Sequence, residues 1–245
     1  MRKIILLSIC TLFIFPLRAN VIINATRVIF PAGSKSVSVQ LINKSKEQHL
    51  IQTWLDDGRQ NEKPENISTP FMIIPPVVKI NGNDGQVLKI NHNHQVTALP
   101  DDRESVFWLN VLDIPPTPES LDAGRNYMQV AIRNRIKLFW RPEKLNLSPR
   151  DIPQHLSIIT DSHKACVDNA TPYYLTIVQL MKWDGKSHRI QQGKKQDNLI
   201  DKTLFIPPFS CLAPADKSFR PASGKYQLVY IDDYGSRVPV IAVLK

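Results

Sequence analysis

Prolines interrupt this 245-residue chain throughout its length, and the chain has 19 of them against only nine glycines. A proline inside a helix removes a backbone hydrogen bond and clashes with the preceding turn, so a bundle of long helices is excluded. The shortage of glycine argues against collagen and against flexible linkers. Because 42% of the residues are hydrophobic, the chain can still bury a substantial core.

Short segments bounded by Pro, Gly, Asn or Asp have the residue pattern of β-strands. We predict strands at 37–42, 50–55, 71–74, 87–90, 106–111, 128–140, 156–159, 173–181, 202–206, 224–231 and 238–244. Asp184-Gly185 predicts a hairpin turn, since glycine supplies the positive φ that such a turn needs. Short strands at this spacing indicate an all-β fold of two β-sandwich domains. A change of pattern after Trp140 places the boundary between residues 20–143 and residues 144–245.

Residues 1–19 have the pattern of a cleaved signal peptide. Arg2 and Lys3 precede an apolar stretch at 4–15, and Ala19 ends a cleavage region. The apolar stretch is too short to span a membrane, which favours cleavage over an uncleaved anchor. Loss of three positive charges with this segment lowers the net charge from +9 to +6. An exported protein of that modest charge is a poor candidate for binding nucleic acid.

Cysteine usage agrees with export. Cys10 leaves with the signal peptide, so Cys166 and Cys211 remain in an oxidising compartment. A bridge between them would close a loop of about 46 residues and contribute up to ~4 kcal/mol in the chain-entropy model. Two buried thiols are the alternative. Zinc is disfavoured because a structural zinc site needs four ligands.

The segment 127–138 has one apolar and one cationic face. Its even positions include Met128, Val130 and Ile132, whereas its odd positions include Arg133, Arg135 and Lys137. One interpretation is an ordinary half-buried strand whose basic face is solvated. The other is an edge strand that pairs with the backbone of a partner and places its apolar side chains in the partner's pockets. The alternation alone does not choose between them.

Several strings in the chain occur together in one known family. They are TRVIF at 26–30, DRESVFWLN at 102–110, IPP at 114–116, IKLFWRP at 136–142 and YIDDYG at 230–235. In this combination and order, the chain resembles the PapD-like periplasmic chaperones of chaperone–usher pili over essentially all of residues 20–245. Cleavage after Ala19 would make Arg27 the eighth mature residue, as in that family. The segment between Pro116 and Met128 is a few residues longer than in the shortest-loop members of that family. It lacks the long insertion and the extra cysteine pair of the long-loop branch, which favours the short-loop branch.

The resemblance implies two Ig-like β-sandwich domains in a boomerang arrangement around a cleft. It further implies a periplasmic chaperone without cofactors that binds pilus subunits and delivers them to an outer-membrane usher. By motif matching, Arg27 and Lys137 would hold the C-terminal carboxylate of a subunit. Met128, Val130 and Ile132 would enter the groove of a subunit that lacks its last strand.

Further roles follow from the same resemblance. Glu104, Arg141 and Asp233 match positions of a salt bridge between the two domains, and a bridge such as Cys166–Cys211 occurs in some members. An exposed apolar edge would also allow two free copies of the chaperone to cap one another as a homodimer.

Other functions find little support in the residues. The chain lacks the motifs of zinc proteases, serine hydrolases and phosphate-binding loops, which argues against an enzyme. His92 and His94 could share a strand face, but no third metal ligand is evident. A secreted adhesion or binding protein of two Ig-like domains is the main alternative, and it would leave the 136–142 string unexplained.

Overall fold

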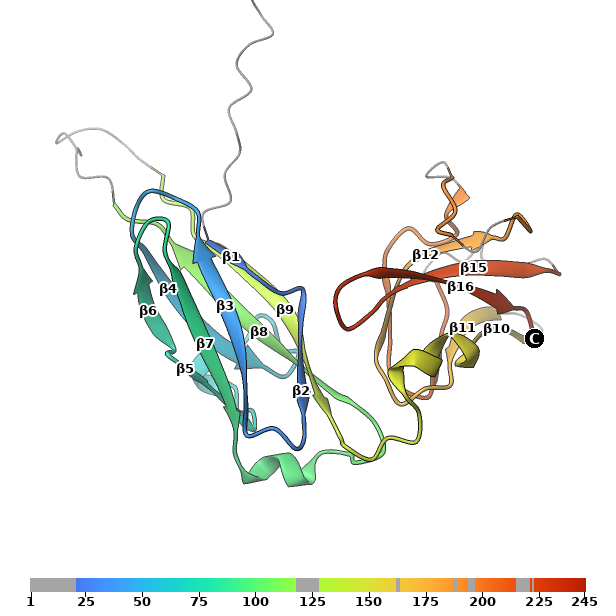
Figure 1. Ribbon diagram of the computed structural model, residues 1–245, viewed down its shortest axis with the longest axis horizontal. Coiled ribbons are helices and arrows are strands. Elements are labelled where there is room, and N and C mark those ends of the chain that lie inside the picture. Colours follow the sequence, from blue (N-terminus) through green and yellow to red (C-terminus); the bar gives the residue numbers. More distant parts are fainter. Residues whose placement is uncertain are drawn as a thin grey trace, which may run out of the picture.

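The computed structural model describes residues 21–117, 128–161, 164–186, 189–193, 197–214, 221 and 223–245. These residues form two β-sandwich domains, which Figure 1 shows as two lobes that meet at an angle. The all-β fold and the boomerang arrangement are therefore as predicted. The predicted signal peptide lies outside the described residues.

The N-terminal sandwich packs a four-stranded sheet, ordered β1-β3-β7-β5, against a five-stranded sheet, ordered β2-β9-β8-β4-β6. Its strands are β1 (Val21–Ile23), β2 (Arg27–Pro31), β3 (Ser36–Asn43), β4 (His49–Asp56), β5 (Phe71–Ile74), β6 (Val77–Ile80), β7 (Gly85–His92), β8 (Ser105–Ile114) and β9 (Ile132–Arg141). Two short 3₁₀ helices, η2 (Pro64–Asn66) and η3 (His94–Ala98), lie in the connections.

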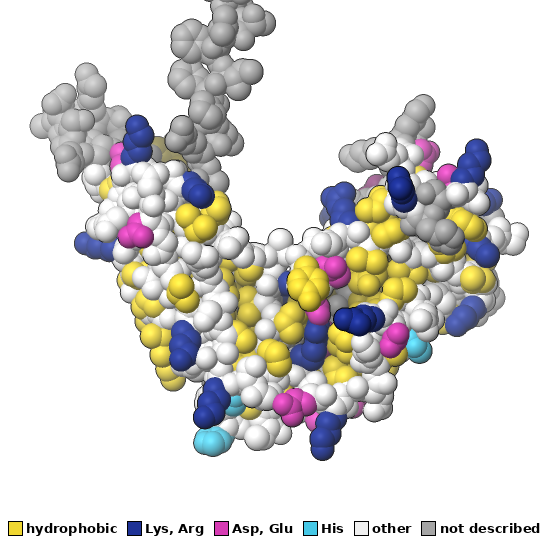
Figure 2. Space-filling view, viewed as in Figure 1, with side chains coloured by type: hydrophobic (Ala, Val, Ile, Leu, Met, Phe, Trp, Pro, Cys, Tyr) yellow, Lys and Arg dark blue, Asp and Glu magenta, His cyan; other side chains and the backbone are white. Residues whose placement is uncertain are grey.

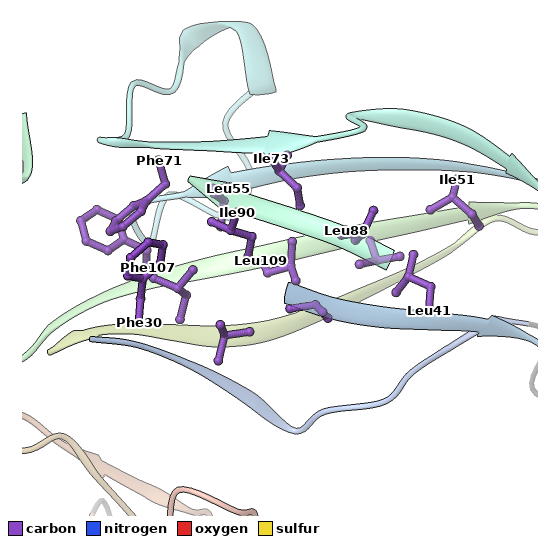
Figure 3. Packing of buried hydrophobic residues seen from close by; sticks show 14 of the residues in the cluster. Phe30, Leu41, Ile51, Leu55, Phe71, Ile73, Leu88, Ile90, Phe107 and Leu109 are labelled. Atoms are coloured by element: carbon purple, nitrogen blue, oxygen red, sulfur yellow. The ribbon is translucent and has the colours of Figure 1, made fainter. Parts of the chain in front are cut away.

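Alternation of side chains along these strands builds the core between the sheets. In β5, for example, Phe71 and Ile73 are buried while Met72 and Ile74 are exposed. Figure 3 shows aromatic side chains at one end of this core and aliphatic side chains such as Leu41 at the other.

The C-terminal sandwich is smaller and has its own hydrophobic core. It packs a three-stranded sheet, ordered β10-β11-β14, against a four-stranded sheet, ordered β13-β12-β15-β16. The strands are β10 (Leu156–Asp161), β11 (Lys164–Asn169), β12 (Leu175–Lys182), β13 (Leu204–Ile206), β14 (Ser210–Leu212), β15 (Lys225–Ile231) and β16 (Arg237–Val243). A 3₁₀ segment, η4 (Pro149–His155), precedes them.

Two predictions about local structure were wrong. The sixth predicted strand starts at Ile132 instead of Met128, because β8 ends at Ile114 and offers residues 128–131 no pairing partner. Gly185 does have positive φ, but β12 hydrogen-bonds to β13 and β15, so Asp184-Gly185 does not close a hairpin between adjacent strands.

Candidate functional site

β9 has a backbone edge that is only partly covered. On one side β8 pairs with it from Ile132 to Trp140. On the other side β2 pairs in parallel and begins only at Arg27, which is aligned with Lys137. Among the described residues, no strand pairs with this side of β9 before Lys137. The segment 128–136 thus offers an open edge beside β2.

The predicted donor residues project from this open segment into solvent. The exposed fractions are 86% for Met128, 59% for Val130 and 49% for Ile132. The intervening Gln129 donates a hydrogen bond from Nε2 to the carbonyl of Pro115 at 2.6 Å. Apolar side chains that recur at every second position of a segment with an open backbone edge are suited to fill a row of pockets in a partner strand pair.

Arg27 and Lys137 lie side by side at the end of the open edge, because the parallel register of β2 and β9 aligns them. Lys137 Nζ lies 3.4 Å from the hydroxyl of Thr176 and 4.2 Å from the ring centre of Phe205. Arg27 donates from Nη1 to the carbonyl of Ile231 at 3.1 Å. Its Nε is buried and finds no acceptor among the described residues.

The electrostatics of these two cations favour an anion between the domains. Burial lowers the pKa of Lys137, and the charges of Arg27 and Arg135 lower it further. Burial also lowers the pKa of Arg27, against the opposing effect of Asp233, Asp232 and Glu104. A bound carboxylate would relieve this repulsion and satisfy the free N–H of Arg27 through charge-assisted hydrogen bonds.

Glu104, Arg141 and Asp233 meet where the two lobes join. Arg141 lies 2.7 Å from Glu104 and 2.7 Å from Asp233, and it contacts Asp233 through both terminal nitrogens. Glu104 also accepts a hydrogen bond from the backbone N–H of Tyr174 at 2.9 Å. Burial alone would lower the pKa of Arg141, but the hydrogen bonds and charges of the two carboxylates outweigh burial and raise it.

Aromatic residues from both domains line the junction. Phe205 of the C-terminal domain stacks on Tyr174 at 5.1 Å and contacts Phe139 and Trp108 of the N-terminal domain. A cavity of about 200 Å³ lies beside them and is bordered by Arg27, among others. Figure 2 shows hydrophobic and charged side chains gathered where the lobes meet.

Three residues of the junction were not predicted from the sequence: Thr176, Tyr174 and Phe205. Each contacts the site only across the junction between domains, and no local pattern marks such a residue.

Other predicted features can be placed as well. Cys166 and Cys211 form a disulfide, with Cα atoms 5.5 Å apart on β11 and β14. Within the described residues, no group of three or more His, Cys, Asp or Glu could hold a metal ion. The same part of the chain contains no helix that is long and apolar enough to cross a membrane.

Family models match nearly the whole of the chain. The model described as "Pili and flagellar-assembly chaperone, PapD N-terminal domain" matches residues 20–146. The model described as "Pili assembly chaperone PapD, C-terminal domain" matches residues 151–242.

Individual relatives agree with the family models. The chaperone protein HifB of Haemophilus influenzae is 40% identical over 224 residues, which cover 91% of this chain and 87% of HifB. The crystal structure of the Pseudomonas aeruginosa CupB2 chaperone matches with a TM-score of 0.71 and 30% identity, over 91% of this chain and 100% of that chain. The fold is also shared by a structure of the Salmonella enterica SafA pilin in complex with the SafB chaperone (TM-score 0.67, 23% identity, 92% of this chain and 96% of that chain). The chain therefore belongs to the PapD family of pilus-assembly chaperones.

Proposed function

We propose that this protein is a non-enzymatic periplasmic chaperone that lends a strand to unassembled pilus subunits and delivers them to an outer-membrane usher. The observation that supports this most is the open edge formed by β9 and the residues before it, which exposes Met128, Val130 and Ile132 and ends at two aligned cations. A subunit that lacks one strand has an apolar groove and unpaired backbone groups, and such an edge can cover both.

Arg27 and Lys137 would anchor the C-terminal carboxylate of the subunit. The anchor matters for register as well as for affinity, because a one-residue slip turns every side chain of a strand to the opposite face. With the terminus held at Lys137, the side chains of Ile132, Val130 and Met128 meet the groove in a fixed order. Burial of three such side chains supplies roughly 5–9 kcal/mol before the costs of association.

Glu104, Arg141 and Asp233 would set the angle between the domains. We place the domain boundary between Glu143 and Lys144, shortly after Arg141 in the chain. The carboxylate of Asp233 comes from the turn between β15 and β16 and the other two side chains come from the N-terminal domain. The cluster would therefore keep the cleft at a width that fits the subunit end.

The donor strand can be tested with a matched pair of variants. Val130→Asp places a charge on the apolar face, whereas Ala131→Asp places the same charge one residue away on the opposite face. Both positions are exposed in the free protein, so neither change should alter its thermal unfolding. We expect Val130→Asp to abolish co-purification of a pilus subunit expressed in the same periplasm, and Ala131→Asp to retain most of it. Equal capture by both variants would refute the donor-strand role.

The anchor needs a separate test, since it can fail while the strand role holds. Lys137→Ala and Arg27→Ala should each reduce subunit capture at least tenfold, which corresponds to the loss of about 1.4 kcal/mol or more from one charge-assisted contact. Circular dichroism must show that both variants are folded. Full capture by folded variants would contradict the anchor. Gel filtration of the free wild type and of Val130→Asp would also show whether two copies pair through the same edge.

A further inference from the structure

Three cations share one face of β9. Arg133, Arg135 and Lys137 occur at every second position, so their side chains emerge on the same side of the sheet. A carboxylate held at Arg135 instead of Lys137 would displace a paired strand by two residues. Such a displacement keeps the apolar side chains on the correct face but moves each into the wrong pocket. Selection of Lys137 therefore requires that Arg135 be unavailable.

In the free protein, Asp56 of β4 forms an ion pair with Arg135. Its two oxygens accept hydrogen bonds from Arg135 Nε at 2.9 Å and from Nη2 at 2.5 Å, which is a bidentate ion pair. The guanidinium also lies 4.5 Å from the ring centre of Trp108. Side-chain exposure is 19% for Arg135 and 1% for Asp56, so water screens this pair little.

The carboxylate of Asp56 is itself held in place by neighbours. Asn110 donates from its side-chain nitrogen at 2.6 Å and Gly58 from its backbone N–H at 2.7 Å. Burial would raise the pKa of Asp56, but hydrogen bonds from Arg135, Asn110 and Gly58 hold it below its usual value. Asp56 is thus ionised, and each of its two oxygens already accepts two hydrogen bonds.

The other two cations on this face of β9, Lys137 and Arg133, have different surroundings. Asp56, Trp108 and Lys137 lie in one cross-strand row, so Trp108 stands between the carboxylate and Lys137. No carboxylate oxygen of a described residue lies within 4 Å of Lys137 Nζ. Arg133 donates to the carbonyl of Gln60 and is exposed. An exposed cation without a second cation beside it holds a carboxylate only weakly.

We infer that Asp56 is a specificity-determining residue, which neutralises Arg135 so that the subunit carboxylate is held at Lys137 and the strand pairs in one register. This inference rests on the proposed function, because it concerns how that function is kept accurate. A carboxylate that approached Arg135 would meet a guanidinium whose charge is already paired with Asp56, and it would be repelled by the negative charge of Asp56.

The test uses Asp56→Asn, which removes the charge and nearly preserves the shape. Val130→Cys in the chaperone is paired with a cysteine in the last strand of the pilus subunit that co-purifies with the wild type. That subunit cysteine stands either opposite Val130 or two residues away, and disulfide-linked complex is measured on a non-reducing gel. With Asp56 intact, only the subunit cysteine opposite Val130→Cys should give disulfide-linked complex. Arg135 released from Asp56 would compete with the Arg27–Lys137 anchor, so Asp56→Asn should lower trapping at the opposite position and add a corresponding amount of trapping at the offset position.

A second substitution separates this role from simple support of the fold. Arg135→Gln removes the competing cation, so the double variant Asp56→Asn/Arg135→Gln should return to the single register. If Asp56→Asn does not fold, Asp56→Ser keeps an acceptor for the N–H of Gly58 and replaces it. Wild-type register in folded Asp56→Asn, or offset trapping that persists in the double variant, would overturn the inference. If the chaperone with Asp56 intact captures no subunit, the proposed function fails instead.

Discussion

The cluster of Glu104, Arg141 and Asp233 allows a quantitative test of how the domains are held together. Arg141→Ala removes the only cation within 4 Å of Glu104 among the described residues. Glu104 is 3% exposed and would keep the backbone N–H of Tyr174 as its remaining donor. An unpaired carboxylate would then be buried at the junction.

The expected cost follows from that burial. Removal of one partner of a buried ion pair costs about 3–5 kcal/mol. Asp233 is 32% exposed at its side chain, so solvent screens its own contact with Arg141 and Asp233→Ala should cost only about 1 kcal/mol. Separation of the domains would rehydrate Glu104, so part of the cost can appear as an opening of the cleft.

The cost should also depend on pH in a defined direction. Burial raises the pKa of Glu104 above its usual 4.5, and loss of Arg141 would raise it further. Because the folded state then holds the proton more tightly than the unfolded chain, the variant is penalised little below pH 4 and fully once the pH exceeds the folded pKa. Adding Glu104→Gln to Arg141→Ala should remove most of this pH dependence.

The assay is urea unfolding followed by tryptophan fluorescence at pH 4, 6 and 8, with small-angle X-ray scattering on the same samples. We expect a lower unfolding midpoint or a larger radius of gyration for Arg141→Ala at pH 8, and near wild-type behaviour at pH 4. A change equivalent to less than 1 kcal/mol with unchanged scattering at pH 8 would refute the reasoning.

Further outcomes are expected at Lys137, at Cys211 and at Gly235. Because the pKa of Lys137 lies below its usual 10.5, subunit capture should fall as the pH rises through that lowered pKa, and Lys137→Arg should retain capture in co-purifications at the same pH. The same shift means that the unfolded chain holds this proton more tightly, so the contribution of Lys137 to stability rises with pH in that range. Cys211→Ser, which breaks the bridge to Cys166, should lower the stability of the C-terminal domain by about 2–4 kcal/mol in urea unfolding. A reducing agent should lower the stability of the wild type but not that of the variant. Gly235 has a φ of +83° and its added Cβ would lie 2.4 Å from the Thr26 hydroxyl, so Gly235→Ala should cost about 1–3 kcal/mol in thermal unfolding, and Thr26→Ala should relieve only the steric part.

Much of the fold could be predicted because the strands obey local rules. Alternation and bounding turn residues place β3, β4 and β5 within about one residue of their observed ends. β6, which follows Pro75-Pro76, was missed because only Ile80 of its four residues is buried, so the segment has no alternating core-facing pattern. The start of β9 was misplaced because pairing depends on where β8 ends, which the strand's own residues do not encode.

The site shows the same division between local and distant information. Motif matching named Arg27 and Lys137, and the parallel register aligns them. The role of Asp56 could not be predicted, since its partner Arg135 is 79 residues away in the chain. Phe205 and Thr176 belong to the other domain, so their contacts with Lys137 depend on the angle at which the lobes meet.

The late start of β2 has a consequence for the direction of any guest chain. β2 runs parallel to β9 and pairs with this edge of β9 from Arg27 onward. A guest strand whose C-terminal carboxylate is bound at Arg27 would have to pair with the uncovered part of this edge, before the start of β2. It would run in the same direction as β2. The first residue of β2 would then act as an end stop, and the sheet would continue from one molecule into the next.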